Sequence, residues 1–218
     1  MDTLTQNDNL EKMRRLFIEY IGNNYEQELK RELSDSQIIT VSGGVCTGKS
    51  TIGKKLRKRN NLEYFSVGSI FRDMAEEREE SVEEFLEYIS EDPEDILEID
   101  VLTSYKAIEK MASGGENGLI ADGHLAGYYS LFLEGLGKQN SLRIYLHADE
   151  DTKSERIKKR RGISDREAKR VMEREENDRE RWKKEFGITV DDESVYHLIL
   201  NTGKTSANGV VNIVEDYL

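Results

Sequence analysis

One stretch, residues 38–51, constrains the fold of this chain more than any other. The β-branched run Ile38-Ile39-Thr40-Val41 leads into a loop bounded by glycines, and a segment compatible with a helix follows. Gly43 through Ser50 matches the spacing G-x-x-x-x-G-K-[ST], which is typical of a loop that binds phosphates between a strand and a helix. The stretch therefore predicts a strand, a phosphate-binding loop and a helix.

Each fixed position of this loop has a physical reason. Glycines at 43 and 48 allow backbone angles that a β-carbon obstructs, so successive N–H groups can turn toward one anion. The N-terminus of the following helix also favours negative charge. Lys49 can reach the β- and γ-phosphates of a nucleotide, and the Ser50 hydroxyl can coordinate Mg²⁺. The loop alone thus predicts nucleotide binding but does not select a reaction.

Length and charge limit what else the chain can be. A chain of 218 residues is long enough for one domain with a sizeable core. No apolar run approaches the roughly 20 residues of a membrane span, and one cysteine, Cys46, fits a reducing compartment, so we expect a cytoplasmic protein. The net charge of −12 argues against a nucleic-acid surface, although residues 153–184 carry fourteen basic and eight acidic side chains. That basic segment suggests a local anion clamp.

Hydrophobic spacing predicts alternating strands and helices after a polar lead-in. Residues 1–36 have apolar positions near a helical period, which indicates one amphipathic helix packed on the body or on a partner. Further strands are expected at 63–67, 118–122, 142–146 and 195–200. Helices are expected at 51–59, 69–78, 81–111 with a break at Pro93, 149–160, 164–186 and 207–217. This alternation predicts a three-layer α/β fold with about five parallel strands.

Several charged residues stand where a phosphate-binding protein would need them. Arg72, on the helix after the second strand, can hold a phosphate, and Asp122, at the end of the third strand, can hold a Mg²⁺-bound water. Arg156 and Arg160 share one helix face. A second helical stripe contains Arg174, Asp178 and Arg181. Such a density of guanidinium groups suits the shielding of transferring phosphates.

In these motifs, the chain from about residue 38 to its C-terminus resembles the nucleoside monophosphate kinases, most closely the archaeal-type cytidylate kinases. The matching segments are Ile39 through Thr51, Ser66-Val67-Gly68-Ser69-Ile70-Phe71-Arg72, Glu91-Asp92-Pro93-Glu94, Asp122-Gly123, Arg156 with Arg160, Arg174 through Arg181, and Tyr196 through Thr202. The resemblance covers more than four fifths of the chain and leaves out residues 1–36.

The resemblance implies where two substrates lie. ATP would lie on Gly43, Gly44, Val45, Cys46, Thr47, Gly48, Lys49, Ser50 and Thr51, with its adenine near Asn201 and Thr202. The acceptor would lie between Gly68, Ser69 and Arg72 and the acidic helices that follow, with Asp178 holding its nucleoside. Arg156, Arg160, Arg174 and Arg181 would be the lid and acceptor-side cations. Residues 1–36 would then be a helical extension, and residues 37–218 one kinase domain with an acceptor-binding insertion at about 68–112 and a lid at about 156–182.

One position departs from the family pattern. An arginine usually follows the acid-glycine pair after the third strand, whereas this chain has His124 in Asp122-Gly123-His124. Histidine can still donate a hydrogen bond to a phosphate, but it lacks the bidentate fork of arginine. The identity of the acceptor depends on this replacement of arginine by histidine.

The sequence therefore predicts an ATP- and Mg²⁺-dependent kinase that phosphorylates a nucleoside monophosphate, CMP or dCMP first among them. Two alternatives remain open. One is a kinase of the same fold that acts on AMP, dephospho-coenzyme A or a small metabolite, and the other is a nucleotide-binding regulatory protein with little catalysis. We expect small-molecule nucleotides as its partners, no nucleic acid or membrane, and a monomer, with a dimer through the N-terminal helix as the alternative state.

Overall fold

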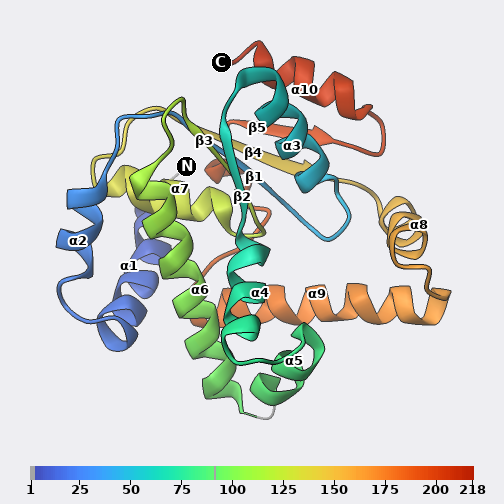
Figure 1. Ribbon diagram of the computed structural model, residues 1–218, viewed down its shortest axis with the longest axis horizontal. Coiled ribbons are helices and arrows are strands. Elements are labelled where there is room, and N and C mark those ends of the chain that lie inside the picture. The colour runs from blue at the N-terminus through green and yellow to red at the C-terminus, as the bar shows by residue number, and fades with distance from the viewer. Residues whose placement is uncertain (1–2, 91) are drawn as a thin grey trace.

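A computed structural model describes residues 3–90 and 92–218 (Figure 1). Within them the strands form one five-stranded sheet in the order β2-β3-β1-β4-β5, and each pair of neighbours is parallel. The strands are β1 (Ile38–Gly43), β2 (Glu63–Ser66), β3 (Leu119–Asp122), β4 (Ser141–His147) and β5 (Leu198–Asn201). β1 is central and fully buried, so the loop that follows it starts from the middle of the sheet. The predicted α/β fold with five parallel strands is confirmed.

Helices cover both faces of this sheet and complete three layers. Helices α3 (Lys49–Asn60) and α10 (Ala207–Glu215) pack on one face, over a cluster that includes Ile39, Ile52 and Val210 (Figure 1). Helix α7 (Ala126–Gly135) covers β1 and β4 on the other face. Because helices bury both sides of each central strand, the sequences of these strands are almost continuously apolar.

Two helical arms extend beyond the sheet. The first contains α4 (Val67–Glu77), α5 (Val82–Ser90) and α6 (Pro93–Ser113), and the second contains α8 (Glu150–Arg161) and α9 (Asp165–Glu185). Pro93 is the first residue of α6, so the predicted break at this proline is confirmed; Glu91 lies outside the described residues. Ser164 and Glu167 stand at capping-box spacing in the sequence, and the box is present: the Ser164 side chain accepts from the Glu167 N–H, and the Glu167 carboxylate accepts from the Ser164 N–H.

The N-terminal segment differs from the single helix that its spacing suggested. It forms α1 (Thr3–Tyr20) and α2 (Tyr25–Glu32), separated by a turn at Gly22, whose φ of +116° suits glycine. Both helices pack on the body: Phe17 contacts the rings of Tyr25, Tyr105 and Phe132 at centroid distances of 5.5, 5.7 and 5.5 Å. The apolar face of this segment is therefore covered within the chain.

Two further expectations need correction. Helix α7 was not among the predicted helices. In the structure Gly127 is required for close packing, since a β-carbon there would lie 2.5 Å from the Tyr196 ring. The last strand begins at Leu198 instead of Val195. Residues Glu193–Val195 form a 3₁₀ turn, and the Tyr196 hydroxyl donates to the Val190 carbonyl at 2.6 Å. In the sequence, the buried Tyr196 thus looks like part of a strand, although it precedes β5.

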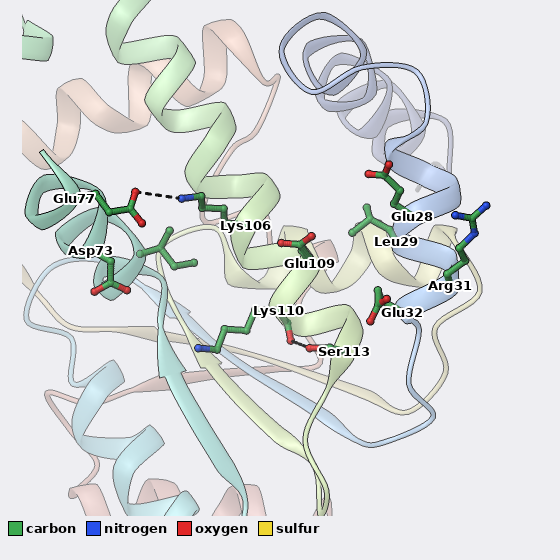
Figure 2. Close-up of a pocket in the computed structure, with 11 residues that line it drawn as sticks. Glu28, Leu29, Arg31, Glu32, Asp73, Glu77, Lys106, Glu109, Lys110 and Ser113 are labelled. Atoms are coloured by element: carbon green, nitrogen blue, oxygen red, sulfur yellow. Dashed lines mark hydrogen bonds and ion pairs between the residues drawn. The ribbon is translucent and has the colours of Figure 1, made fainter.

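A broad hollow of about 680 Å³ is lined by residues of α2, α4 and α6 (Figure 2). Its walls carry side chains of both signs; Lys106 pairs with Glu77 at 4.0 Å, and the Lys110 ammonium lies 5.1 Å from the centre of the Phe65 ring. None of the predicted site residues lines it. Within residues 3–90 and 92–218, no helix is long and apolar enough to cross a membrane.

Candidate active site

The loop after β1 has the backbone conformation that its glycines suggested. Gly43 has a φ of +142°, and a β-carbon there would lie 2.2 Å from the Leu146 carbonyl oxygen of the neighbouring strand. Gly48, at φ +99°, precedes α3, and its carbonyl accepts from the Ile52 N–H at 3.0 Å. Cys46 is the loop's non-glycine residue in the left-handed region, with a φ of +54°. The loop thus ends at a helix N-terminus, which favours anions.

Lys49 lies folded back over the loop. Its ammonium donates to the Gly43 and Gly44 carbonyl oxygens at 2.8 and 2.7 Å. Burial lowers the pKa of Lys49 to about 8, although the nearby carboxylates of Asp122 and Glu175 act in the opposite direction. A phosphate in the loop would replace the carbonyl partners and favour the charged ammonium.

A cavity of about 400 Å³ opens between this loop, α8 and the turn after β5. The loop residues from Cys46 to Thr51 line it, together with Arg156, Lys159, Arg160, Thr202 and Thr205. Arg156 joins its walls, because the guanidinium donates to the Thr202 carbonyl at 2.7 Å and to the Cys46 carbonyl at 3.3 Å. The Asn201 side chain instead shapes the turn by accepting from the Gly203 and Lys204 N–H groups at 2.9 and 3.2 Å.

Asp122 ends β3 at the edge of the sheet where the loop begins. Its carboxylate is 2% exposed and accepts from the hydroxyls of Ser66, at 2.8 Å, and Tyr64. Tyr64 also interacts with Ser50, and its pKa is raised to about 12, first by burial and then by its hydrogen bond to Asp122. Ser50 and Asp122 are thus connected through one hydroxyl. Both present hard oxygen atoms, the ligands that Mg²⁺ prefers, so these residues fit the predicted ion.

The residues predicted for the acceptor lie on both arms. Arg72 on α4 turns back toward Gly68 and lowers the pKa of Tyr64 by its charge, while the Ser69 hydroxyl donates to the Ser66 carbonyl at 2.6 Å. On α9, Arg181 pairs with Asp178 at 2.9 Å and with Asp100 of α6 at 2.8 Å. Asp178 and Arg181 therefore lie together between the arms, whereas Arg174 is exposed on α9.

His124 lies between Asp122 and the inner face of α9. Its ring centroid is 5.5 Å from that of Trp182, and Nδ1, which is buried without a hydrogen-bond partner, lies 4.0 Å from the Glu175 carboxylate. Burial lowers the pKa of His124 well below its usual value, and the charges of Lys49, Arg179 and Lys153 lower it further. The imidazole is therefore neutral at physiological pH.

Sequence reasoning missed five residues at this site. Tyr64 and Ser66 bind Asp122, and Lys153 and Arg179 surround Glu175, which is 6% exposed and accepts from the Val45 N–H at 2.9 Å. In the sequence Glu175 lies among interleaved charges, a pattern typical of a solvated helix. The spacing of Glu175 did indicate burial. It lies seven residues after Ala168, so the two share one helix face, and they are the buried residues of α9 within the described part of the chain.

A central strand, a phosphate loop at its carboxyl end and two helical arms with facing cations define a phosphate-binding-loop kinase. More specifically, the chain belongs to the cytidylate kinase-like family, whose sequence model matches residues 38–204. The chain is 36% identical to the cytidylate kinase of Pyrococcus horikoshii over 83% of its length and 88% of that protein, and 35% identical to that of Methanococcus maripaludis over 82% and 95%. The predicted resemblance is confirmed, and the protein is a nucleoside monophosphate kinase.

Solved structures support the fold. A shikimate kinase from Bacteroides thetaiotaomicron superposes with a TM-score of 0.52 at 16% identity, covering 83% of this chain and 97% of that one. The protein TT1252 from Thermus thermophilus gives 0.52 at 14% identity, over 85% and 99%. At such identities the likeness concerns the arrangement of strands and helices.

Proposed function

We propose that this kinase transfers the γ-phosphoryl group of ATP to CMP or dCMP. The observation that carries the proposal is the extent of the match to proteins named cytidylate kinase, which covers both arms as well as the loop. Arm residues set the acceptor in an enzyme of this class, so a match confined to the loop would have supported nucleotide binding alone. We expect the reaction to take place in the cytoplasm, by a monomer.

The donor half of the proposed site consists of the loop and the cavity of about 400 Å³. The amides of residues 43–51 and the Lys49 ammonium would bind the phosphates, while Arg156 and Arg160 would neutralise charge on the transferring group. Ser50 and Asp122 would hold Mg²⁺, which neutralises the phosphate oxygens when bound. The turn at Asn201 and Thr202 would border the adenine.

The acceptor half lies between the arms. Gly68, Ser69 and Arg72 would approach the monophosphate, and the pair formed by Asp178 and Arg181 would face the nucleoside, with Arg174 supplied from the same helix on closure. His124 is neutral and can donate or accept a hydrogen bond, but not both from one nitrogen. Catalysis would rest on alignment and charge neutralisation, and no protein nucleophile is required.

An acceptor panel tests this proposal. ADP formation from ATP is measured with CMP, dCMP, UMP, AMP, dephospho-coenzyme A and shikimate, at equal concentrations and with a water blank for hydrolysis. We expect the highest kcat/KM with CMP or dCMP. A preference for another acceptor would reassign the substrate within the same class, and ATP binding without turnover of any acceptor would favour a regulatory protein.

A further inference from the structure

We infer that the Glu175 carboxylate occupies a position of a nucleotide phosphate at the loop, and that Lys153 and Arg179 are further phosphate-binding residues, which pair with Glu175 until ATP displaces it. The inference rests on the proposed use of ATP and extends it to residues outside the predicted set. It also gives α9 a defined role, because this helix carries Glu175, the side chain that ATP would displace.

The first support is the position of the carboxylate. Glu175 Oε1 accepts from the Val45 N–H at 2.9 Å, inside the loop whose amides are arranged for an anion. The contact is close, since a β-carbon on Gly44 would lie 2.3 Å from the same oxygen. A carboxylate that accepts from a loop amide uses the donor that a phosphate oxygen would use.

The second support is the charge around it. Lys153 Nζ lies 3.4 Å from Glu175 Oε2, and Arg179 Nε lies 3.9 Å from Oε1. The field of Glu175 also raises the pKa of Lys49, as does that of Asp122. The buried carboxylate thus faces three cations, and its removal would take a charged partner from each of them beside a free amide. Those are the components of a phosphate site.

The third support is competition for space. Glu175 and a phosphate cannot both accept from the Val45 N–H. Binding of ATP must therefore displace the carboxylate, either by a change of the Glu175 rotamer or by a movement of α9. A phosphate carries more charge than a carboxylate and can take over all three cations. The nucleotide would then release Arg179, which also bonds Tyr145 at 3.2 Å and Asp191 at 3.2 Å, toward the transferring group.

Binding measurements test the substitution. Calorimetry of Mg·ATP without acceptor is carried out on the parent protein, Glu175→Gln and the matched control Glu176→Gln, which removes the same charge from an exposed position of α9. We expect Glu175→Gln to lower the Kd by about tenfold, the scale of one charge-assisted hydrogen bond, and Glu176→Gln to change it less than about twofold. Equal affinities of the two variants would overturn the inference.

The two cations need their own test. In the Glu175→Gln background, Lys153→Gln and Arg179→Gln should each raise the Kd for Mg·ATP by about tenfold, whereas Lys183→Gln, an exposed control on α9, should not. Hydrogen exchange of the loop peptide containing Val45 gives a readout independent of affinity. Its protection should fall in Glu175→Ala, which has no side-chain acceptor, and return with Mg·ATP, and unchanged protection would count against the hydrogen bond.

The outcomes separate this inference from the proposed function. If the parent protein binds Mg·ATP and phosphorylates CMP while Glu175→Gln matches its control, only the role of Glu175 fails. If the parent binds no Mg·ATP and Glu175→Gln does, the carboxylate blocks the loop as inferred. If neither binds, both the proposed donor and the inference are wrong.

Discussion

At the scale of single residues, backbone geometry and one lysine set the fixed positions of the phosphate loop. Gly43 and Gly48 have positive φ, and Lys49 lies over the loop as the motif requires. The partners of Asp122 were not readable, because Tyr64 and Ser66 reach it from the neighbouring strand through register, which a sequence motif does not encode. The buried environment of Glu175 depends on contacts from the loop and α8, which its charged neighbours do not indicate, although its spacing from Ala168 places both residues on one face of α9.

Replacing Lys49 by methionine tests the loop chemistry. Lys49→Met should reduce kcat by about 100-fold or more, since it removes a preorganised cation from the transferring phosphate. Lys54→Met, on the exposed side of the same helix, is the matched control and should retain parent turnover. Steady-state ADP formation with CMP measures both, and parent-like turnover by Lys49→Met would refute the loop mechanism.

His124 should make the free energy of unfolding depend on pH. Because burial depresses its pKa in the folded protein, the unfolded chain takes up this proton first as the pH falls. The contribution is complete above about pH 6.5 and is lost as the pH falls below that value. We therefore expect urea unfolding to show falling stability from pH 7.5 to pH 5, with a shallower slope in His124→Gln.

The control for this titration is His147→Gln, which removes an exposed ring. Part of the pH dependence of the unfolding free energy should persist in both variants, because the pKa of His197 is also lowered, by burial and then by Arg143. A slope in His124→Gln equal to that of the parent would show that this imidazole does not titrate as described.

At the scale of helices and strands, prediction succeeded where periodicity and a local signal agreed. The break at Pro93 and the cap at Ser164 are examples, because both depend on neighbouring residues only. Helix α7 was missed for the opposite reason. Its Gly127 is required by a distant partner, Tyr196, and a glycine required by packing looks the same in a sequence as one required by a turn.

The packing of α7 can be tested with two glycines of the same helix. Gly127→Ala places a β-carbon 2.5 Å from the buried Tyr196 ring and should destabilise the protein by about 1–3 kcal/mol. Gly135→Ala meets Arg14 at an ordinary 3.5 Å and should stay within about 0.5 kcal/mol of the parent. Urea midpoints with unchanged m-values measure both, and equal effects would mean that the contact is not restrictive.

At the scale of the whole molecule, the sequence predicted three layers and a resemblance that excluded residues 1–36. The boundary at residue 37 and the arms at about 68–112 and 156–182 remain our proposed division of the chain. The packing of α1 and α2 was not readable, since their apolar stripe fits the body or a partner equally well. In the structure this apolar stripe completes the core around α6 and α7, and α2 forms one wall of the hollow in Figure 2.

Neighbouring residues of α1 test this packing. Phe17 is 0% exposed, and Phe17→Ala should cost about 3–5 kcal/mol of unfolding free energy because it leaves a cavity among three aromatic rings. Ile18, 47% exposed, is the control, and Ile18→Ala should change the stability by less than about 0.5 kcal/mol. A small loss for Phe17→Ala would mean that the N-terminal helices fold apart from the body.

The chain has one tryptophan, Trp182, and its place makes it a natural probe of arm movement. The indole belongs to α9, donates to Asp100 of α6 at 3.1 Å, and packs beside His124 at the end of the sheet. Separation of the two arms would break that hydrogen bond and wet the ring, which shifts its emission to longer wavelength. Any separation of these arms can therefore be followed in the unlabelled protein, by the emission wavelength of a single fluorophore.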